Sequence, residues 1–199
     1  MPAEQNGVGQ SLLTSLETFA WSVRETPLRY LGDPVLREKC TKVAADEFKT
    51  SSIKHLAIEL VKVLMDYRQN VGVGRGLAAN QIGATKQMIA VLLGDEPEVF
   101  CNPRLIASKG MGSYGESCLS SGVMLLGEVR RPWTGKFEYE NLDGVTKTLD
   151  ADELKTRVIL HEIDHLNGIS CSDKYEPKTM RIVTGGKAEV FGERFKKLD

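Results

Sequence analysis

The chain has 199 residues, enough to bury a hydrophobic core and, by default, to form a single domain. Hydrophobic residues make up 41% and charged residues 27% of the chain, which excludes the disordered and fibrous classes. The formal net charge of -1 argues against the dominant basic surface of a nucleic-acid binder. The longest apolar run, residues 88–93, is far below the roughly 20 residues of a membrane span. We therefore expect neither a nucleic-acid nor a membrane partner.

The four cysteines lie far apart without a CxxC pair, so neither a disulfide scaffold nor a zinc ribbon is indicated. A reducing compartment and a cytoplasmic location are expected. Residues 1–25 contain early acidic residues, one arginine and no continuous apolar core, unlike a secretory or transit segment. They are interpreted as an N-terminal extension to one domain formed by residues 26–199.

The first predicted element is a helix over residues 52–70, where apolar side chains recur at a spacing of three to four. Ser51 or Ser52 is the expected cap at its start. Residues 71–83 contain four glycines and break this pattern. The apolar run over residues 87–93 then predicts a buried strand, so the glycine segment joins a helix to a strand.

Strands dominate the middle of the chain. Residues 100–101 and 105–108 predict two short strands with punctuated ends. Residues 133–140 alternate polar and apolar side chains, and an Asp-Gly pair at 143–144 predicts a tight turn before a further strand over residues 145–149. This segment is therefore predicted to be a hairpin.

A second helix follows the hairpin. Asp150 or Asp152 is expected to cap it, and it should run to about Asn167, where Gly168 provides a stop. So many of its residues are apolar that it should be largely buried. The whole pattern predicts an α+β fold in which mostly antiparallel sheets pack around this buried helix.

The strongest chemical signal is the HEIDH sequence at residues 161–165 in this helix. His161 and His165 lie one helical turn apart, so both rings are able to bind one metal ion. Glu162 lies about 100° around the helix, where a carboxylate can reach a water beside the metal without binding the metal. The alternative is a chance pairing in a buried helix, which would bury unpartnered imidazoles and carboxylates at high cost.

The third ligand of such a site is not determined by spacing. A catalytic metal held by two helix histidines usually takes one more protein ligand and keeps a position for water. Asp173 and Glu176 lie downstream of the helix, and Cys118 lies upstream. Residue types alone leave these alternatives open.

Three separate segments resemble the peptide deformylase family and occur in the family's order: residues 74–81 (GRGLAANQ), 116–120 (ESCLS) and 161–165 (HEIDH). Residues 29–37 (RYLGDPVLR) also resemble the family's N-terminal segment. The resemblance covers roughly residues 28–175, and the three motifs together are highly specific.

The resemblance implies a metal-dependent hydrolase that removes the formyl group from the formyl-methionine of nascent polypeptides and releases formate. It implies the metal ligands Cys118, His161 and His165, the general acid/base Glu162, and the oxyanion donors Gln81 (side chain) and Leu119 (backbone N–H). Fe(II) is the usual physiological metal of the family, and Zn(II), Ni(II) or Co(II) are able to replace it. The expected partners are N-formylated nascent peptides, with action near the ribosome.

The resemblance also implies a substrate-binding edge formed by Gly74, Arg75, Gly76 and Ser117. The family usually has a glycine at 117, and an aliphatic residue at 75 that lines the pocket for the methionine side chain. Arg75 is a poor wall for an apolar group. It is expected either to extend outward, leaving its methylenes as lining, or to admit a different first residue of the substrate.

Glu116 and Arg130 are expected to pair and to brace the loop of Cys118, since metal ligands usually need supporting hydrogen bonds. Cys40, Cys101 and Cys171 are expected to be small buried thiols rather than ligands. Two rival interpretations remain: a general peptidase with the same two-histidine helix, and a non-catalytic descendant or deformylase-like protein with altered substrate preference.

Overall fold

The computed structural model describes residues 27–183 and 196–198. The extension predicted for residues 1–25 lies outside this part of the chain. The strands are β1 (Gly76–Ala78), β2 (Met88–Val91), β3 (Glu98–Glu116), β4 (Leu125–Glu140), β5 (Thr146–Ala151), β6 (Arg181–Ile182) and β7 (Lys196–Lys197). The longer helices are α2 (Ser51–Val71) and α3 (Glu153–Leu166), and the short 3-10 helices are η1 (Pro34–Arg37), η2 (Glu47–Lys49), η3 (Ala79–Ile82), η4 (Leu119–Ser121) and η5 (Cys171–Lys174).

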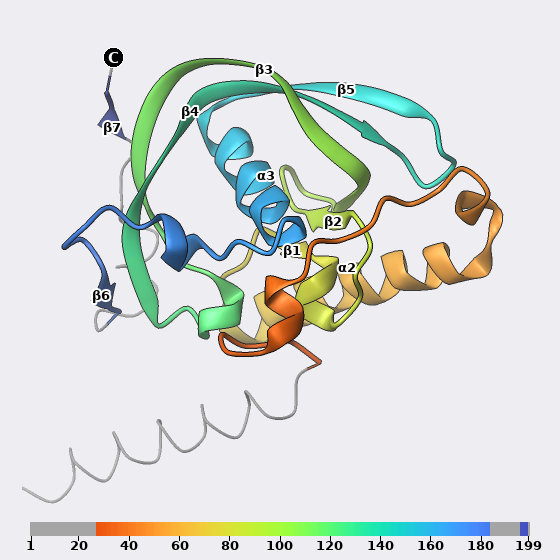
Figure 1. The fold of residues 1–199 in the computed structure, drawn as a ribbon, viewed down its shortest axis with the longest axis horizontal. Coiled ribbons are helices and arrows are strands. Elements are labelled where there is room, and N and C mark those ends of the chain that lie inside the picture. The colour runs from red at the N-terminus through yellow and green to blue at the C-terminus, as the bar shows by residue number, and fades with distance from the viewer. Residues whose placement is uncertain (1–26, 184–195, 199) are drawn as a thin grey trace, which may run out of the picture.

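The strands form an antiparallel sheet in the order β1-β2-β3-β4-β5, with β6 beside β4 and β7 beside β3. The long strands β3 and β4 bend over α3, while α2 lies on the far side of β1 and β2 (Figure 1). The predicted combination of helices with antiparallel sheet is confirmed.

Helix α2 forms as its apolar spacing predicts. It places Ile53, Leu60, Leu64 and Tyr67 in the core and ends at Gly72, which adopts a left-handed conformation with φ of 82°. The predicted cap is wrong by one or two residues. The helix begins at Ser51, so the capping position falls on Thr50, whose side chain makes no capping hydrogen bond to the helix.

Strands β1 and β2 lie between the two long helices and are buried on both faces. Alternation along β2 points Met88 and Ala90 into the core beside α2, and Ile89 and Val91 into the core beside α3. This explains why the run reads as continuously apolar. The sequence analysis missed β1, because its three residues lie in the glycine-rich segment that was interpreted as a connection.

The two short strands predicted around Asn102 and Pro103 are wrong, since both belong to the single long strand β3. The pairing of β3 with β4 shifts register between Cys101 and Arg104, which is where Pro103 falls. Proline is tolerated at such irregularities because no ladder hydrogen bond is needed from it there. Asn102 adopts a φ of 52° at the same point, so the turn signal marks a bulge and the strand continues.

The hairpin is confirmed: β4 pairs with β5 around the predicted turn, where Gly144 has a φ of 73°. Strand β4 is longer than predicted, because it begins at Leu125 rather than near Trp133. This extra length brings β4 alongside the Glu116 end of β3.

Helix α3 is capped by the side chain of Asp152, which accepts a hydrogen bond from Lys155 N, and it ends before Gly168 as predicted. Gly168 has a φ of 75°, and a Cβ there would lie 2.4 Å from the carbonyl oxygen of Arg37. The end of α3 is therefore held against the N-terminal segment, and Cys40 N donates to Leu166 O at 2.8 Å.

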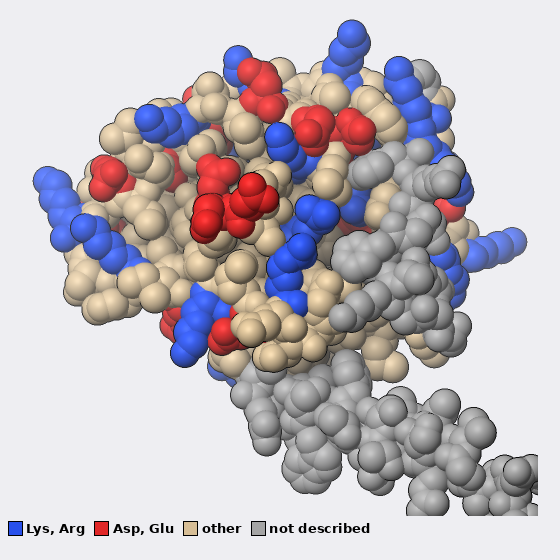
Figure 2. Space-filling view, turned by 180° about the vertical axis from the view of Figure 1, so that it is seen from behind, with Lys and Arg blue, Asp and Glu red and all other residues tan. Residues whose placement is uncertain are grey.

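Charges of both signs are interspersed over the face seen from behind, without a field of one sign (Figure 2). None of the described helices is long and apolar enough to cross a membrane.

Gly168→Ala should lower the free energy of unfolding by roughly 1–3 kcal/mol, because it combines a strained φ with a backbone contact. Urea denaturation checks this change. Gly94→Ala is the matched control, since no atom lies within 4 Å of a Cβ at Gly94. Equal stability of the two variants would contradict the close packing of α3 against Arg37.

Candidate metal centre

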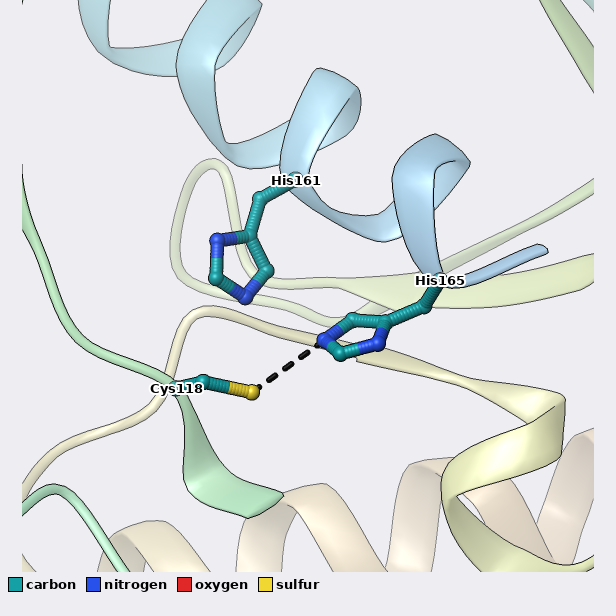
Figure 3. Close-up of side chains that lie close together, drawn as sticks. All are labelled: Cys118, His161 and His165. Carbon is teal, nitrogen blue, oxygen red and sulfur yellow. Dashed lines mark hydrogen bonds between the residues drawn. The ribbon is translucent and has the colours of Figure 1, made fainter. Parts of the chain in front are cut away.

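One sulfur and two imidazoles converge beside α3. His161 and His165 project from successive turns of that helix, and Cys118 precedes η4, which follows β3. One ligand atom from each residue lies within 4.8 Å of the others (Figure 3). Cys118 Sγ is 3.1 Å from His165 Nε2. The structure thus brings together the three residues for which the resemblance implies metal binding.

A buried carboxylate orients the first histidine. A hydrogen bond of 2.9 Å joins His161 Nδ1 to Oε2 of Glu116. The other ring nitrogen, Nε2, is thereby left to face Cys118 and His165. Burial opposes ionisation of Glu116, but the charge and hydrogen bonds of Arg131 hold the pKa of Glu116 well below its usual range. Glu116 is therefore an anion. Burial opposes a charged His161, but the hydrogen bond to Glu116 together with the nearby acidic groups raises the pKa of His161 to about 9.

His165 is enclosed on all sides and is 0% exposed. Burial, followed by the charge of His161, lowers the pKa of His165 well below its ordinary value. The ring is therefore neutral, which is the form that binds a metal. Asn80 fixes the helix backbone at this point by donating a hydrogen bond of 2.6 Å to His165 O.

The donor set suits a divalent transition metal. Thiolate and imidazole ligands fit Zn(II) and Fe(II), whereas Mg(II) and Ca(II) prefer oxygen ligands. Three protein ligands leave a coordination position for water or substrate, as in catalytic sites. The downstream alternatives are engaged elsewhere: Asp173 pairs with Arg37, and Glu176 Oε1 lies 3.1 Å from Arg130 Nε.

Glu162 lies beside the triad (Cys118, His161 and His165) and is 4% exposed. Burial raises the pKa of Glu162 to about 7, although His161 and Arg131 favour its charged form. Its Oε2 atom is buried and has no hydrogen-bond partner among the described residues. A Cβ at Gly76 would lie 2.3 Å from Glu162 Oε1, so glycine is required there for this carboxylate to take its place.

Gln81 also lies beside Cys118. Its Oε1 accepts a hydrogen bond from Ala78 N at 2.8 Å, which fixes the amide orientation. Its Nε2 donates to Ser120 Oγ at 3.0 Å and lies 3.6 Å from Cys118 Sγ. The donor of Gln81 is thus held next to the triad.

A cavity of about 330 Å³ opens beside the triad. The predicted site residues that line it are Gly74, Arg75, Gly76, Gln81, Ser117, Leu119, His161 and Glu162. The buried hydroxyl of Ser117 has no hydrogen-bond partner among the described residues. Tyr114, Leu154, Arg157 and Val158 complete much of the wall, and the sequence analysis did not identify them.

The predicted pair of Glu116 with Arg130 is wrong. Arg131, the next residue, holds Glu116 through Nε (2.6 Å) and Nη2 (2.9 Å) and also reaches Asp164 through Nη1 (2.7 Å). Side chains alternate along β4, so Arg131 points inward while Arg130 points outward to Glu176. The predicted strand began at Trp133, and alternation was therefore not applied as far back as Arg131.

Cys171 is buried as predicted, but it also belongs to the surroundings of the triad. It shares a hydrogen bond with Cys118, which raises the pKa of Cys118 and lowers that of Cys171. Tyr175 Oη lies 3.3 Å from Cys171 Sγ and donates to Glu116 O at 3.0 Å. No local sequence signal pointed to this contact, because it joins the segment after α3 to the end of β3.

Arg131→Met should lower the free energy of unfolding by about 3–5 kcal/mol, because it leaves Glu116 and Asp164 buried without their shared cation. Arg130→Met is the matched control on the adjacent residue. Its side chain is 59% exposed, so the loss should stay below about 1 kcal/mol. Chemical denaturation measures both variants, and a larger loss for Arg130→Met would reverse the assignment.

Comparison with known proteins agrees with this geometry. The family model "Polypeptide deformylase" matches residues 26–181. A peptide deformylase of Thermoanaerobacter pseudethanolicus is 35% identical over 148 residues, covering 74% of this chain and 87% of the relative. The crystal structure of a peptide deformylase from Thermotoga maritima has a TM-score of 0.68 and 28% identity, covering 75% of this chain and 97% of that one. The enzyme from Synechococcus elongatus, solved in complex with actinonin, has a TM-score of 0.67 and 33% identity, covering 76% and 79%. The chain therefore belongs to the polypeptide deformylase family.

Proposed function

We propose that this chain is a peptide deformylase that hydrolyses the N-formyl group of the formyl-methionine at the start of nascent polypeptides and releases formate. The observation that carries the proposal is the convergence of Cys118, His161 and His165 beside Glu162 at one end of a cavity. Membership of the family supports the same reaction.

The triad would hold one divalent metal, with His161 and His165 supplied by the two-histidine motif of α3. When bound, such an ion supplies Lewis-acid activation of water and of the formyl carbonyl. We propose Fe(II) as the physiological metal, with Zn(II), Ni(II) or Co(II) as functional substitutes. The mixed sulfur and nitrogen donor set suits these ions.

Glu162 moves the proton in this reaction. Its carboxylate accepts a proton from the attacking water and delivers it to the nitrogen of the departing amine. The raised pKa of about 7 places Glu162 where it is able to perform both transfers near neutral pH.

Gln81 and Leu119 stabilise the charge that develops on the formyl oxygen. The Nε2 donor of Gln81 is already oriented by Ala78 N, so little reorganisation is needed when the charge appears. The backbone N–H of Leu119, next to Cys118, is the second proposed donor. Glu116 supports the site through His161, together with Arg131 in place of the predicted Arg130.

The substrate chain is proposed to lie along the edge of Gly74, Arg75, Gly76 and Ser117, which lines the cavity. Because the proposed substrate is a nascent chain, we also propose that the protein acts in the cytoplasm and close to the ribosome.

Metal-loaded protein incubated with formyl-Met-Ala-Ser should release formate, because a formyl group is small enough to reach the triad through the cavity. Acetyl-Met-Ala-Ser should stay intact. A coupled formate assay measures the reaction, and anaerobic metal analysis gives the metal content. Removal of the metal by a chelator should abolish turnover, and added Fe(II) or Co(II) should restore it. Cleavage of internal peptide bonds would favour a general peptidase instead.

Glu162→Gln should lower kcat by at least about 100-fold while leaving the metal bound, since the amide is unable to accept the proton. Cys118→Ser should lower the metal content itself, which separates the two roles. The metal content and melting temperature of Glu162→Gln serve as controls, because they show that the variant is folded and holds the metal. Turnover by Glu162→Gln at the rate of the unsubstituted protein would remove Glu162 from its proposed role.

A second candidate is the same hydrolysis with a different preferred first residue. The observation in its favour is the presence of two arginines, Arg75 and Arg157, in the cavity wall.

A further inference from the structure

Two residues in the wall of the cavity have a buried oxygen without a hydrogen-bond partner among the described residues: Glu162, through Oε2, and Ser117, through Oγ. Since neither atom has a partner, they do not bond to each other. The proposed proton transfer explains why the oxygen of Glu162 is free. It leaves the hydroxyl of Ser117 unexplained, although a buried polar group without a hydrogen bond destabilises a folded protein.

The backbone on both sides of Ser117 is held in place. Glu116 is the last residue of β3, and its carbonyl oxygen accepts a hydrogen bond of 3.0 Å from Tyr175 Oη. Cys118 caps η4, because its sulfur accepts a hydrogen bond of 3.3 Å from Ser120 N. Residue 117 is therefore pre-positioned at the cavity, and a ligand that bonds to its hydroxyl needs to order little of the chain.

The chemistry of the proposed substrate limits what this hydroxyl is able to bind. In the proposed reaction, the formyl oxygen is bound by Gln81 and Leu119, and the scissile nitrogen receives its proton from Glu162. The methionine side chain is apolar apart from a weakly accepting sulfur. The polar groups that remain near the reacting end are the carbonyl and the N–H of the first peptide bond.

Of these two groups, the carbonyl is the better partner for Ser117. A serine hydroxyl has one hydrogen to donate and two lone pairs with which to accept. Among backbone groups, buried donors without a partner are rarer than incompletely satisfied acceptors, so a donor has the stronger need of a partner. The peptide carbonyl offers an acceptor, whereas a bond to the N–H would leave the hydroxyl hydrogen unpaired.

We infer that Ser117 donates a hydrogen bond from Oγ to the carbonyl of the first peptide bond, and so selects formylated peptides over formylated amines that lack this carbonyl. The inference rests on the proposed hydrolysis and deepens it by naming one recognition contact. The family usually has a glycine at this position, which offers no such donor. The contact is present in the bound substrate and in the transition state alike, so its loss raises KM and leaves kcat unchanged.

The test measures formate release by the metal-loaded protein from three substrates. Formyl-Met-Ala-Ser has the carbonyl and the N–H, the methyl ester of formyl-methionine has the carbonyl alone, and N-formyl-3-(methylthio)propylamine has the same thioether chain and neither group. Ser117→Ala should lower kcat/KM about three- to tenfold for the first two substrates, as expected for a neutral hydrogen bond. It should leave kcat/KM for the formylated amine unchanged.

Ser117→Gly restores the residue that is usual in the family and should show the same substrate pattern as Ser117→Ala. Ser108→Ala is the matched control, because Ser108 is exposed on β3 and lies outside the cavity. The inference would be overturned by an equal loss with the formylated amine or by no loss with the peptide. A loss confined to the peptide would overturn it too, because the N–H would then be the partner.

Stability separates this role from a purely structural one. Removal of a hydroxyl that bonds to the protein lowers the melting temperature, whereas removal of an unpaired buried hydroxyl leaves it unchanged or raises it. Ser117→Ala should therefore melt no lower than the unsubstituted protein and should hold the same amount of metal. A lower melting temperature would give the hydroxyl a partner within the protein and contradict the inference.

Binding distinguishes a failure of this inference from a failure of the proposed function. Isothermal titration with the product peptide Met-Ala-Ser should give a Kd that is about three- to tenfold higher for Ser117→Ala than for the unsubstituted protein. The two proteins should bind 3-(methylthio)propylamine equally. Absence of formate release from every formylated substrate would refute the proposed hydrolysis alone. Equal affinities of the two proteins for Met-Ala-Ser would refute the contact of Ser117.

Discussion

The buried carboxylate of Glu116 is the constraint on which the metal centre depends. Burial of an isolated carboxylate is very unfavourable, so the surrounding structure has to supply cations and hydrogen bonds. Strand β4 supplies Arg131, and α3 supplies Arg157 and His161. Each of these contacts joins β3 to another element of the fold. The network that keeps Glu116 ionised therefore also sets the position of α3 relative to β3, and with it the orientation of His161 toward Cys118.

The sandwich of β1 and β2 between α2 and α3 provides the rigid support for this network. Both faces of these strands are packed, so a slip of one residue would exchange the side chains between the two core clusters and disrupt the packing of both. Gly76 at the start of β1 contacts Glu162, and Gln81 in η3 contacts Ser120 and Cys118. The rigidity of a buried sheet is in this way transmitted directly to the groups that surround the triad.

The apolar spacing and the turn residues of the sequence correctly predicted several elements of the fold. Helix α2, the β4–β5 hairpin and the stop at Gly168 follow from spacing and turn chemistry, and all three are present. The signal at Asn102 and Pro103 was misread as the end of a strand, because a bulge and a turn use the same residue types. Arg131 was within reach of the sequence: counting by two from Phe137 back through Trp133 places it on the inward face. The shorter predicted strand prevented that step.

The sequence by itself determined the chemistry that is available: two histidines one helical turn apart, a glutamate between them, and a cysteine in a motif that resembles a known family. Covalent spacing and helical geometry impose these relations locally. Only the tertiary structure decided which cation neutralises Glu116, that Cys171 contacts Cys118, and that Arg157 joins Arg75 in the cavity wall. Those contacts depend on strand register and on the packing angle of α3, and both are set by the burial of the whole core.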